Sequence, residues 1–541
     1  MRKPLQNPGL CKRQAIGLGL SATALLALAW NVKAQTPGLP DVSFNGTGKL
    51  VTNTPNNYPS SHGEAIGIQN NGRIVIAGSI GDSRYLAALQ ENGTFSTGWG
   101  NGSAIGVNDD NYCSSGCTSG LNALKMMGTS EFIAVGWTKT MGSTSGKRFF
   151  LNKYASSGVG LWSVPVFNGR GEDLSSGDDI AYDLELQADG RILLVGSADA
   201  VIGVARFDTD GWLDLSYADA GEQLIDITNG DEERATACHL TPDGKLVLVG
   251  WVGYGTDYQG VVFQLDTNGD LDPSFSNDGV TDGWQELEFI PGASSFLTDV
   301  HITDNGDIYL LGDVLDQGRN WALAKLTANG QLVPGFGGDG TVSLDLDMPI
   351  DLSAALAWQS DGKLIVVGST GNLTDGQTCV ARYLSNGTLD NTFGTGGLSC
   401  VQIEDLSFPA DVTIDAMGRI VVVGTSYNEF MAPSTYVMRM LSGLNVGVME
   451  FSIHEDILNV YPNPIAETTI LRYILAESQE LTIALHDLQG RVLAAYLNGK
   501  DMPAGEHTQT ITMPSDLASG NYLLVFSSPK GKMSVQVTKA D

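Results

Sequence analysis

One pattern of apolar and polar positions recurs through the middle of the chain. An alternating stretch leads into a polar turn that ends in glycine, and four apolar residues and a second glycine follow. The clear copies are NNGRIVIAG (Asn70–Gly78), ADGRILLVG (Ala188–Gly196), PDGKLVLVG (Pro242–Gly250), DNGDIYLLG (Asp304–Gly312), SDGKLIVVG (Ser360–Gly368) and AMGRIVVVG (Ala416–Gly424), with a degenerate copy, GTSEFIAVG, at Gly128–Gly136. Successive closing glycines lie 54 to 62 residues apart, which indicates seven copies of one structural unit.

Each repeat has a second half that ends on an aromatic residue. Its best copies are VARFDTDGWLDLSY (Val204–Tyr217), VFQLDTNGDLDPSF (Val262–Phe275) and VARYLSNGTLDNTF (Val380–Phe393). The aromatic residue recurs at Trp99, Tyr217, Phe275, Phe336 and Phe393. Phe44 matches the same position ahead of the first full repeat, whereas the seventh repeat stops near Leu441 without one. The N-terminal segment therefore carries the part that the last repeat lacks.

The periodicity of one repeat predicts four antiparallel strands. Alternation ahead of the turn, as at Cys238 and Leu240, is typical of a strand. The apolar run after the turn is too short for a helix and rich in β-branched residues, which predicts a strand buried on both faces. The Val-Ala-Arg segment supplies a third strand, and the Leu-Asp-x-x-Phe segment with its following glycines leads into a fourth. Glycine in the polar turn supplies the positive φ that a tight hairpin needs.

Seven such units predict an all-β fold, with a seven-bladed β-propeller over residues 35–444. The segment Asp41–Leu50 is expected to pair into the last blade and close the ring, which removes free sheet edges. An open β-solenoid is the alternative, but solenoid repeats are shorter and need capping units. The alternating strand, the DGK/R turn, IVVVG and ARY…NGxLDxxFG resemble the delta-60 repeat of large exported bacterial proteins, over Pro37–Leu444. The resemblance implies an architecture and no general catalytic activity.

A different composition begins after residues 445–452, which we interpret as a linker. Six alternating segments predict a small immunoglobulin-like β-sandwich over residues 453–541. Four motifs resemble the type A sorting domain of the type IX secretion system of Bacteroidetes: VYPNP (Val460–Pro464), DLQGRV (Asp487–Val492), LASGNYLL (Leu517–Leu524) and KMSVQV (Lys532–Val537). The candidate motif residues are Tyr461, Pro462, Asn463, Pro464, Gly490, Gly520, Tyr522 and Lys532. The resemblance implies export across the outer membrane, usually with removal of the domain; an ordinary adhesion module is the alternative.

The N-terminal 34 residues have the features of a cleaved secretory signal peptide. A basic region precedes an apolar run from Ala15 to Trp30, and Val32-Lys33-Ala34 offers a small-x-small cleavage site. The alternative, a transmembrane anchor, is weaker because the run is short. Cleavage removes five basic residues and changes the formal net charge from −31 to −36. So acidic a protein repels phosphate backbones and anionic bilayers, which argues against nucleic-acid and membrane-surface roles.

Five cysteines follow the signal, and an exported chain meets an oxidising compartment in which they can pair. Cys113 and Cys117 lie four residues apart in a Ser/Gly-rich loop, which favours a small local disulfide over a metal site. Cys379 and Cys400 are expected on neighbouring strands and form a second candidate pair. Cys238 occupies an apolar column of the repeat, which predicts a core position.

Recognised catalytic motifs are absent from the sequence. It contains neither a Gly-x-Ser-x-Gly elbow nor a His-Glu-x-x-His zinc site. His239 and His301 occupy the same repeat position, five residues before the turn glycine, so two neighbouring blades could present imidazoles for a metal. We favour variable polar positions on the innermost strand. Asp-rich turns at Asp208–Asp214 and Asp266–Asp272 are interpreted as hairpin chemistry, with weak Ca²⁺ binding as the alternative and no cofactor expected.

These features together predict a non-enzymatic exported protein at the cell surface or in the medium. It would act in binding, adhesion or as a scaffold, with the type IX machinery as one partner and an unidentified extracellular glycan or protein as another. The mature chain is expected to have no transmembrane anchor. The rival hypothesis is an extracellular glycan hydrolase or lyase whose carboxylates come from separate blades.

Overall fold

A computed structural model gives the structure of this protein. It describes residues 36–52, 60–100, 107–108, 117–128, 131–140, 146–164, 177–228, 232–255, 257–276, 280, 282–346, 348–372, 374–443, 459–475, 479–486, 492–503, 505–515, 517–528 and 531–540. The predicted signal peptide (1–34) and linker (445–452) lie outside these ranges. Among the described residues we find no helix with the length and apolar character needed to span a bilayer.

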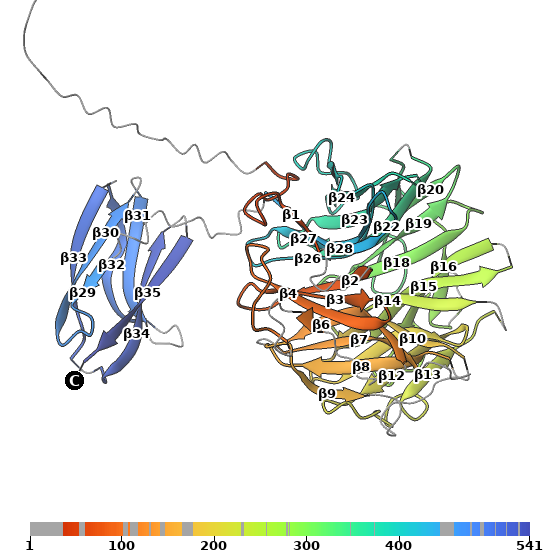
Figure 1. Cartoon of the computed structure of the whole chain (residues 1–541), viewed down its shortest axis with the longest axis horizontal. Coiled ribbons are helices and arrows are strands. Elements are labelled where there is room, and N and C mark those ends of the chain that lie inside the picture. The colour runs from red at the N-terminus through yellow and green to blue at the C-terminus, as the bar shows by residue number, and fades with distance from the viewer. Residues whose placement is uncertain are drawn as a thin grey trace, which may run out of the picture. The chain divides into compact units, whose positions relative to one another are not determined.

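The fold is all-β, and its first part is a propeller built from sets of four antiparallel strands (Figure 1). Six sets use consecutive strands: β2 (Ser61–Ile68), β3 (Ile74–Ile80), β4 (Ser83–Leu89), β5 (Val107–Asn108); β6 (Cys117–Met127), β7 (Glu131–Thr140), β8 (Arg148–Tyr154), β9 (Gly160–Val164); β10 (Asp179–Leu186), β11 (Ile192–Ala198), β12 (Val201–Phe207), β13 (Glu222–Ile225); β14 (Glu233–Leu240), β15 (Leu246–Tyr254), β16 (Asp257–Leu265), β17 (Trp284–Leu287); β18 (Ser295–Ile302), β19 (Ile308–Leu315), β20 (Arg319–Leu326), β21 (Thr341–Leu344); β22 (Ile350–Trp358), β23 (Leu364–Gly371), β24 (Gly376–Tyr383), β25 (Leu398–Val401).

The seventh set combines the two ends of the repeat array. Strands β26 (Leu406–Ile414), β27 (Ile420–Tyr427) and β28 (Pro433–Met440) are consecutive, and β1 (Lys49–Val51) pairs antiparallel with β28 as the fourth strand. Figure 1 shows β1, in red, beside β27 and β28. The first strand of every set contacts the first strand of the next, and β26 contacts β2, so the contacts form a closed circuit.

Burial follows the predicted periodicity of the repeat. The second and third strands of each set are almost wholly buried, as in the run Leu364–Val367 of β23, where both faces are covered. Each hydrophobic cluster joins neighbouring sets: Val195 and Ile202 of the third set pack with Cys238 and Leu248 of the fourth. Cys238 is a free buried thiol, which confirms its predicted core position. Stacking of one sheet upon the next therefore generates the core.

The aromatic residue that ends a repeat packs under a turn glycine of the following set. A Cβ placed on Gly269, whose φ is +99°, would lie 2.6 Å from the Tyr217 ring. The same relation joins Trp99 with Gly158, Phe275 with Gly330, Phe336 with Gly387, and Phe44 with Gly93. The glycine is required twice over, since the backbone is left-handed and the ring leaves no room for a side chain.

Replacing Gly269 with Ala is expected to lower the free energy of unfolding by about 2–4 kcal/mol, because it adds left-handed strain to overpacking against Tyr217. Gly244→Ala is the matched control: its φ is +85°, but the nearest atom to a Cβ is Thr267 Cγ2 at 3.7 Å. That variant should lose only about 1–2 kcal/mol. Calorimetric melting of both variants measures the difference, and equal losses would contradict the packing role of Tyr217.

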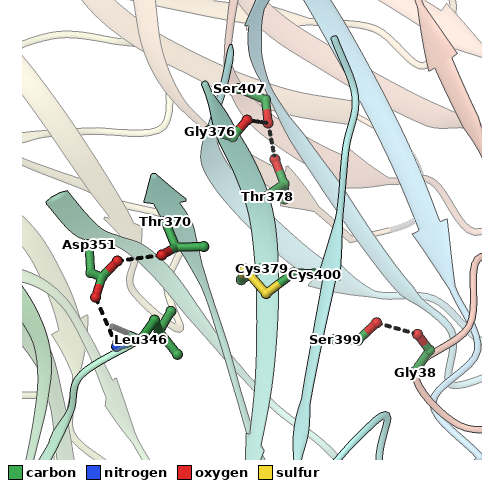
Figure 2. Close-up of a disulfide and its surroundings, with 10 residues drawn as sticks. All are labelled: Gly38, Leu346, Asp351, Thr370, Gly376, Thr378, Cys379, Ser399, Cys400 and Ser407. Carbon is green, nitrogen blue, oxygen red and sulfur yellow. Dashed lines mark hydrogen bonds between the residues drawn. A yellow bond between two sulfur atoms is a disulfide. The ribbon is translucent and has the colours of Figure 1, made fainter. Parts of the chain in front are cut away.

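A disulfide joins the third and fourth strands of the sixth set (Figure 2). Cys379 of β24 and Cys400 of β25 are direct cross-strand partners, and their side chains are bonded across a sequence separation of 21 residues. A buried hydroxyl network lies beside it, in which the Thr378 hydroxyl donates to Ser407 and contacts the Tyr436 hydroxyl. The cross-link stabilises the sheet mainly by restricting the unfolded chain. Of the other candidate pair, Cys113 and the side chain of Cys117 lie outside the described residues.

The C-terminal part consists of two antiparallel sheets that share one hydrophobic cluster. The first sheet is formed by β29 (Asn459–Tyr461), β30 (Thr468–Leu475) and β33 (Gly505–Thr512). The second has the order β32 (Val492–Met502), β31 (Gln479–His486), β34 (Gly520–Ser528), β35 (Gly531–Lys539). Leu471 and Ile511 of the first sheet pack with Leu485 and Phe526 of the second, as alternation of apolar and polar positions predicts.

Candidate functional site: the central channel

The first strands of the seven sets surround a cavity of about 630 Å³ on the axis of the ring. Every described first strand contributes residues to its lining. The repeat position that contains His239 and His301 faces this cavity in all seven sets, and its members are Gly67, Lys125, Glu185, His239, His301, Ala357 and Thr413. The position that the sequence singled out is therefore a ring of channel residues, and its variability gives the channel its chemistry.

The two histidines lie side by side, an arrangement that the sequence analysis considered but did not favour. The ring centroids of His239 and His301 are 4.9 Å apart in an edge-to-face arrangement, and His301 stacks on Trp358 with centroids 5.7 Å apart. His239 Nδ1 donates to the carbonyl of Leu240 over 3.0 Å, which leaves Nε2 as the acceptor nitrogen. Burial lowers the pKa of both imidazoles, that of His301 to about 4, so both rings are neutral at pH 7.

An ion pair faces the histidines. Lys125 Nζ lies 2.7 Å from Glu185 Oε1, and the lysine side chain remains 42% exposed to the channel. Burial opposes the charge on Lys125, but the carboxylates of Glu185 and Asp183 outweigh it and raise the lysine pKa. Within the described part of the chain, no group of three or more His, Cys, Asp or Glu side chains is arranged to hold a metal ion.

Three aspartates that the sequence analysis missed bridge neighbouring first strands. Each first strand has a β-bulge, and Asp183, Asp299 and Asp411 directly follow the bulge in the third, fifth and seventh sets. One oxygen of each accepts the N–H of the next residue in its own strand, at 2.8, 2.7 and 2.7 Å. The other oxygen accepts an N–H from the next set, at Cys238, Leu356 and Ile66 respectively.

A signal for these aspartates was present in the sequence. Aspartate stands seven residues before the turn glycine in these three repeats, where the other four have Ala65, Ala123, Ala237 and Ala355. Because this repeat position contains aspartate in some copies and alanine in others, an alignment of the repeats classifies it as neither apolar nor polar. Only the bulge, which re-aims this residue towards the neighbouring strand, gives the carboxylate its role.

These carboxyl groups should make stability fall as pH rises. Burial raises the pKa of Asp299 to about 8, and those of Asp183 and Asp411 to about 6, above the roughly 3.9 of an unfolded chain. Between these values the folded state binds more protons than the unfolded state, so the free energy of unfolding decreases with increasing pH.

Asp299→Asn should remove part of this pH dependence. At pH 5 the variant is expected to lose about 1–3 kcal/mol, since the amide cannot accept both N–H groups. Its Tm should then decline less between pH 5 and pH 8.5 than that of the unsubstituted protein. Melting curves over this range measure the effect, with the exposed turn residue Asp210→Asn as control. A slope unchanged by Asp299→Asn would contradict the assignment.

Glu64 differs from the three aspartates. It occupies the bulge of β2 and lines the channel, and burial raises the pKa of its carboxyl to about 7. Among the described residues it forms neither a hydrogen bond nor an ion pair. Glu64 is thus the channel carboxylate without a structural task.

The Asp-rich turns use their carboxylates locally. Asp208 Oδ1 accepts the N–H groups of Asp210 and Trp212, and Asp266 Oδ1 accepts those of Asn268, Gly269 and Asp270. This is the expected chemistry of an Asx turn. Weak Ca²⁺ binding at these turns stays a prediction.

The sorting-motif residues are distributed around the start and the end of the C-terminal part. Tyr461 is 75% exposed at the end of β29, and Asn463 Oδ1 accepts the N–H of Thr538 in β35 at 2.9 Å. The Tyr522 hydroxyl donates to the carbonyl of Ala518, four residues earlier. Pro462 and Pro464 lie in the turn between β29 and β30, and Gly520 begins β34. Gly490 and the side chain of Lys532 lie outside the described residues.

Comparison with known families decides what the two parts are. Residues 187–217, 241–275 and 359–393 match a domain of unknown function (DUF5122) β-propeller, and residues 459–539 match a secretion system C-terminal sorting domain. The chain contains repeats that match the DUF5122 β-propeller family and a C-terminal sorting domain. Both predicted resemblances are confirmed, and the sorting domain implies export through the type IX system.

Solved structures similar to this chain include two lyases and a semaphorin. A catalytically inactive virginiamycin B lyase from Staphylococcus aureus is 12% identical, with a TM-score of 0.42 over 72% of this chain and 98% of that one. An ulvan lyase is 10% identical, with a TM-score of 0.42 over 71% and 95%. Drosophila Semaphorin 2a is 9% identical, with a TM-score of 0.39 over 90% and 96%. No curated protein matches the chain.

Proposed function

We propose that this exported propeller is a non-enzymatic binding protein whose central channel receives an extracellular ligand. The observation that carries the proposal is the ring of channel residues five positions before the turn glycine. It brings two neutral imidazoles and an ion pair together around a cavity of about 630 Å³, next to Trp358. A concave site into which several polar groups converge is typical of ligand binding.

The channel aspartates favour binding over acid–base catalysis. Each of the three uses both carboxylate oxygens to hold backbone N–H groups of two strands. Because both oxygens of each carboxyl group are engaged by backbone N–H groups, these side chains are not free to contact a substrate. Their role is therefore to hold neighbouring sets together around the ligand.

Glu64 supports the rival hypothesis of an extracellular hydrolase or lyase. A carboxyl with a pKa of about 7 and no partner suits proton transfer at neutral pH. Under this hypothesis, Glu64→Gln would abolish turnover of a polysaccharide substrate. Under the binding hypothesis, neither the unsubstituted protein nor the variant turns over a polysaccharide.

The test uses the full mature chain and a panel of immobilised glycans and extracellular proteins. We expect at least one panel member to bind and remain chemically unchanged. Thr413→Trp, which places a large ring on the channel wall and narrows the channel, should weaken that binding at least about tenfold, a loss of about 1.4 kcal/mol. Thr395→Trp is the matched control, because Thr395 is exposed in a turn of the sixth set. Binding that survives Thr413→Trp, or product release from the bound material, would overturn the proposal.

A further inference from the structure

Aromatic and arginine side chains alternate across the third, fourth and fifth sets. We call this feature the rim stripe, and its members are Tyr182, Arg234, Trp251, Tyr258, Phe296 and Arg319. The Arg234 guanidinium lies 4.8 Å from the Tyr182 ring centroid and 5.3 Å from that of Trp251. Centroids of Trp251 and Phe296 are 5.8 Å apart, those of Tyr258 and Phe296 are 4.9 Å apart, and Arg319 lies 5.0 Å over Phe296.

The rim stripe starts at the channel and stays open to solvent. Tyr182 lines the channel cavity, and all six side chains are half-buried. Arg234 of β14 and Trp251 of β15 are direct cross-strand partners, so the pairing of the two strands holds these side chains next to each other. The stripe is therefore a continuous surface from the channel mouth outward.

The repeat itself does not require these aromatic residues. Trp251 follows the closing glycine of its repeat, and the same position contains Ser79, Ser197, Ser369 and Thr425 in four other sets, Asp313 in the fifth set and Trp137 in the second. A position that small polar residues fill in four of the seven sets has no general packing role. Large rings from the neighbouring sets, Tyr182 and Phe296, gather beside Trp251 and Arg234, which indicates a local function.

The stripe carries little net charge. Arg319 is paired with Asp313 at 2.7 Å and Arg234 with Glu232 at 3.2 Å, so each guanidinium is matched by a carboxylate. Aromatic rings therefore alternate along the stripe with arginine–carboxylate pairs, which are neutral overall and offer hydrogen-bond donors and acceptors. A pyranose has the same division, with an apolar C–H face and hydroxyl groups around its edge.

We propose that the rim stripe binds a neutral polysaccharide chain and leads its end into the channel. This proposal rests on the binding function proposed above and names the ligand class. Sugar rings pack on Trp251 and Phe296, while the paired arginines and carboxylates hydrogen-bond the hydroxyls. A polyanionic glycan is disfavoured, because the guanidinium charges are already compensated and the protein as a whole carries −31.

The test titrates the full mature chain with cellohexaose, laminarihexaose and mannohexaose, read by tryptophan fluorescence and calorimetry. At least one neutral hexasaccharide should bind, and Trp251→Ala should weaken it at least about tenfold, as expected for a central aromatic contact. Trp251→Phe keeps a ring and should retain most of the affinity. Trp212→Ala is the control, since Trp212 is 44% exposed on a turn away from the stripe, and its affinity should not change.

Three results would overturn the inference, and they differ from failure of the proposed function. If none of the neutral hexasaccharides binds while a protein or a uronic acid chain does, the binding function stands and the ligand class is wrong. If binding of a hexasaccharide is lost in Thr413→Trp but retained in Trp251→Ala, the channel binds the sugar without the rim stripe. Equal weakening by Trp251→Ala and Trp212→Ala would also exclude a specific role for the stripe.

Discussion

Asp41→Asn is expected to lower the free energy of unfolding by about 3–5 kcal/mol, because it leaves a buried guanidinium without its carboxylate. Arg439 is only 1% exposed; its Nε donates to Asp41 Oδ2 at 2.8 Å and its Nη2 donates to Ser43 Oγ at 2.9 Å. Its Nη1 donates to the carbonyl of Glu91 in the first set, and its guanidinium lies over the Phe44 ring. One side chain therefore joins the N-terminal segment, the last set and the first set.

Loss of the Asp41–Arg439 ion pair should open the ring at the contact between the N-terminal segment and β28. Hydrogen exchange can detect this opening. Backbone bonds from Gly38 to Leu441 and from Asp41 to Arg439 hold the segment beside β28, as does the β1–β28 pairing. Hydrogen bonds and side-chain contacts, and no covalent link, hold the N-terminal segment against β28. Amide exchange at 49–51 and 436–438 should therefore accelerate in Asp41→Asn well beyond the change at other strands.

The sixth set offers a matched control for this substitution. Asp390 pairs with Arg382 at 2.9 Å, in the same way that Asp41 pairs with Arg439, and both Asp390 and Arg382 are buried. In that set the chain is continuous and the Cys379–Cys400 disulfide joins β24 to β25. Asp390→Asn should cost stability without faster exchange in β1. Similar exchange at 49–51 in both variants would contradict closure by Arg439.

Deletion of residues 459–541 is expected to abolish appearance of the protein outside the cell. The deleted residues contain the match to the secretion system sorting domain, and their two sheets share a core made of their own residues. We expect the truncated chain to accumulate in the periplasm, with extracellular protein reduced at least about tenfold. Immunoblots of cell fractions and medium measure this, against the full chain and a periplasmic marker for leakage.

Misfolding of the truncated chain must be distinguished from loss of sorting. The propeller clusters involve residues 44–440, so truncation leaves them intact. Protease resistance and the melting temperature of periplasmic material should match those of the full chain. Normal extracellular delivery of the truncated protein would show that residues 459–541 are not the sorting determinant.

Part of the channel site was predictable because the repeats can be aligned. His239 and His301 share one repeat position, and equivalent positions on the first strands of a ring must face the same axis. The contact of His301 with Trp358 was not predictable, since it depends on how far one first strand is rotated against the next. The bridging role of Asp299 was missed for the same reason: its partner, the N–H of Leu356, lies 57 residues away.

The sequence by itself determined the strands, the turns and the closure of this protein. These depend on local rules, namely alternation with a period of two and glycine at positive φ, and repetition makes each rule visible several times. The match of Phe44 to the aromatic position even indicated which strand was displaced. Only the tertiary structure decided which side chains meet in the channel, across the bulges and along the rim stripe. Such contacts join residues of neighbouring sheets whose separation is set by packing and twist, and no local pattern in the chain encodes that geometry.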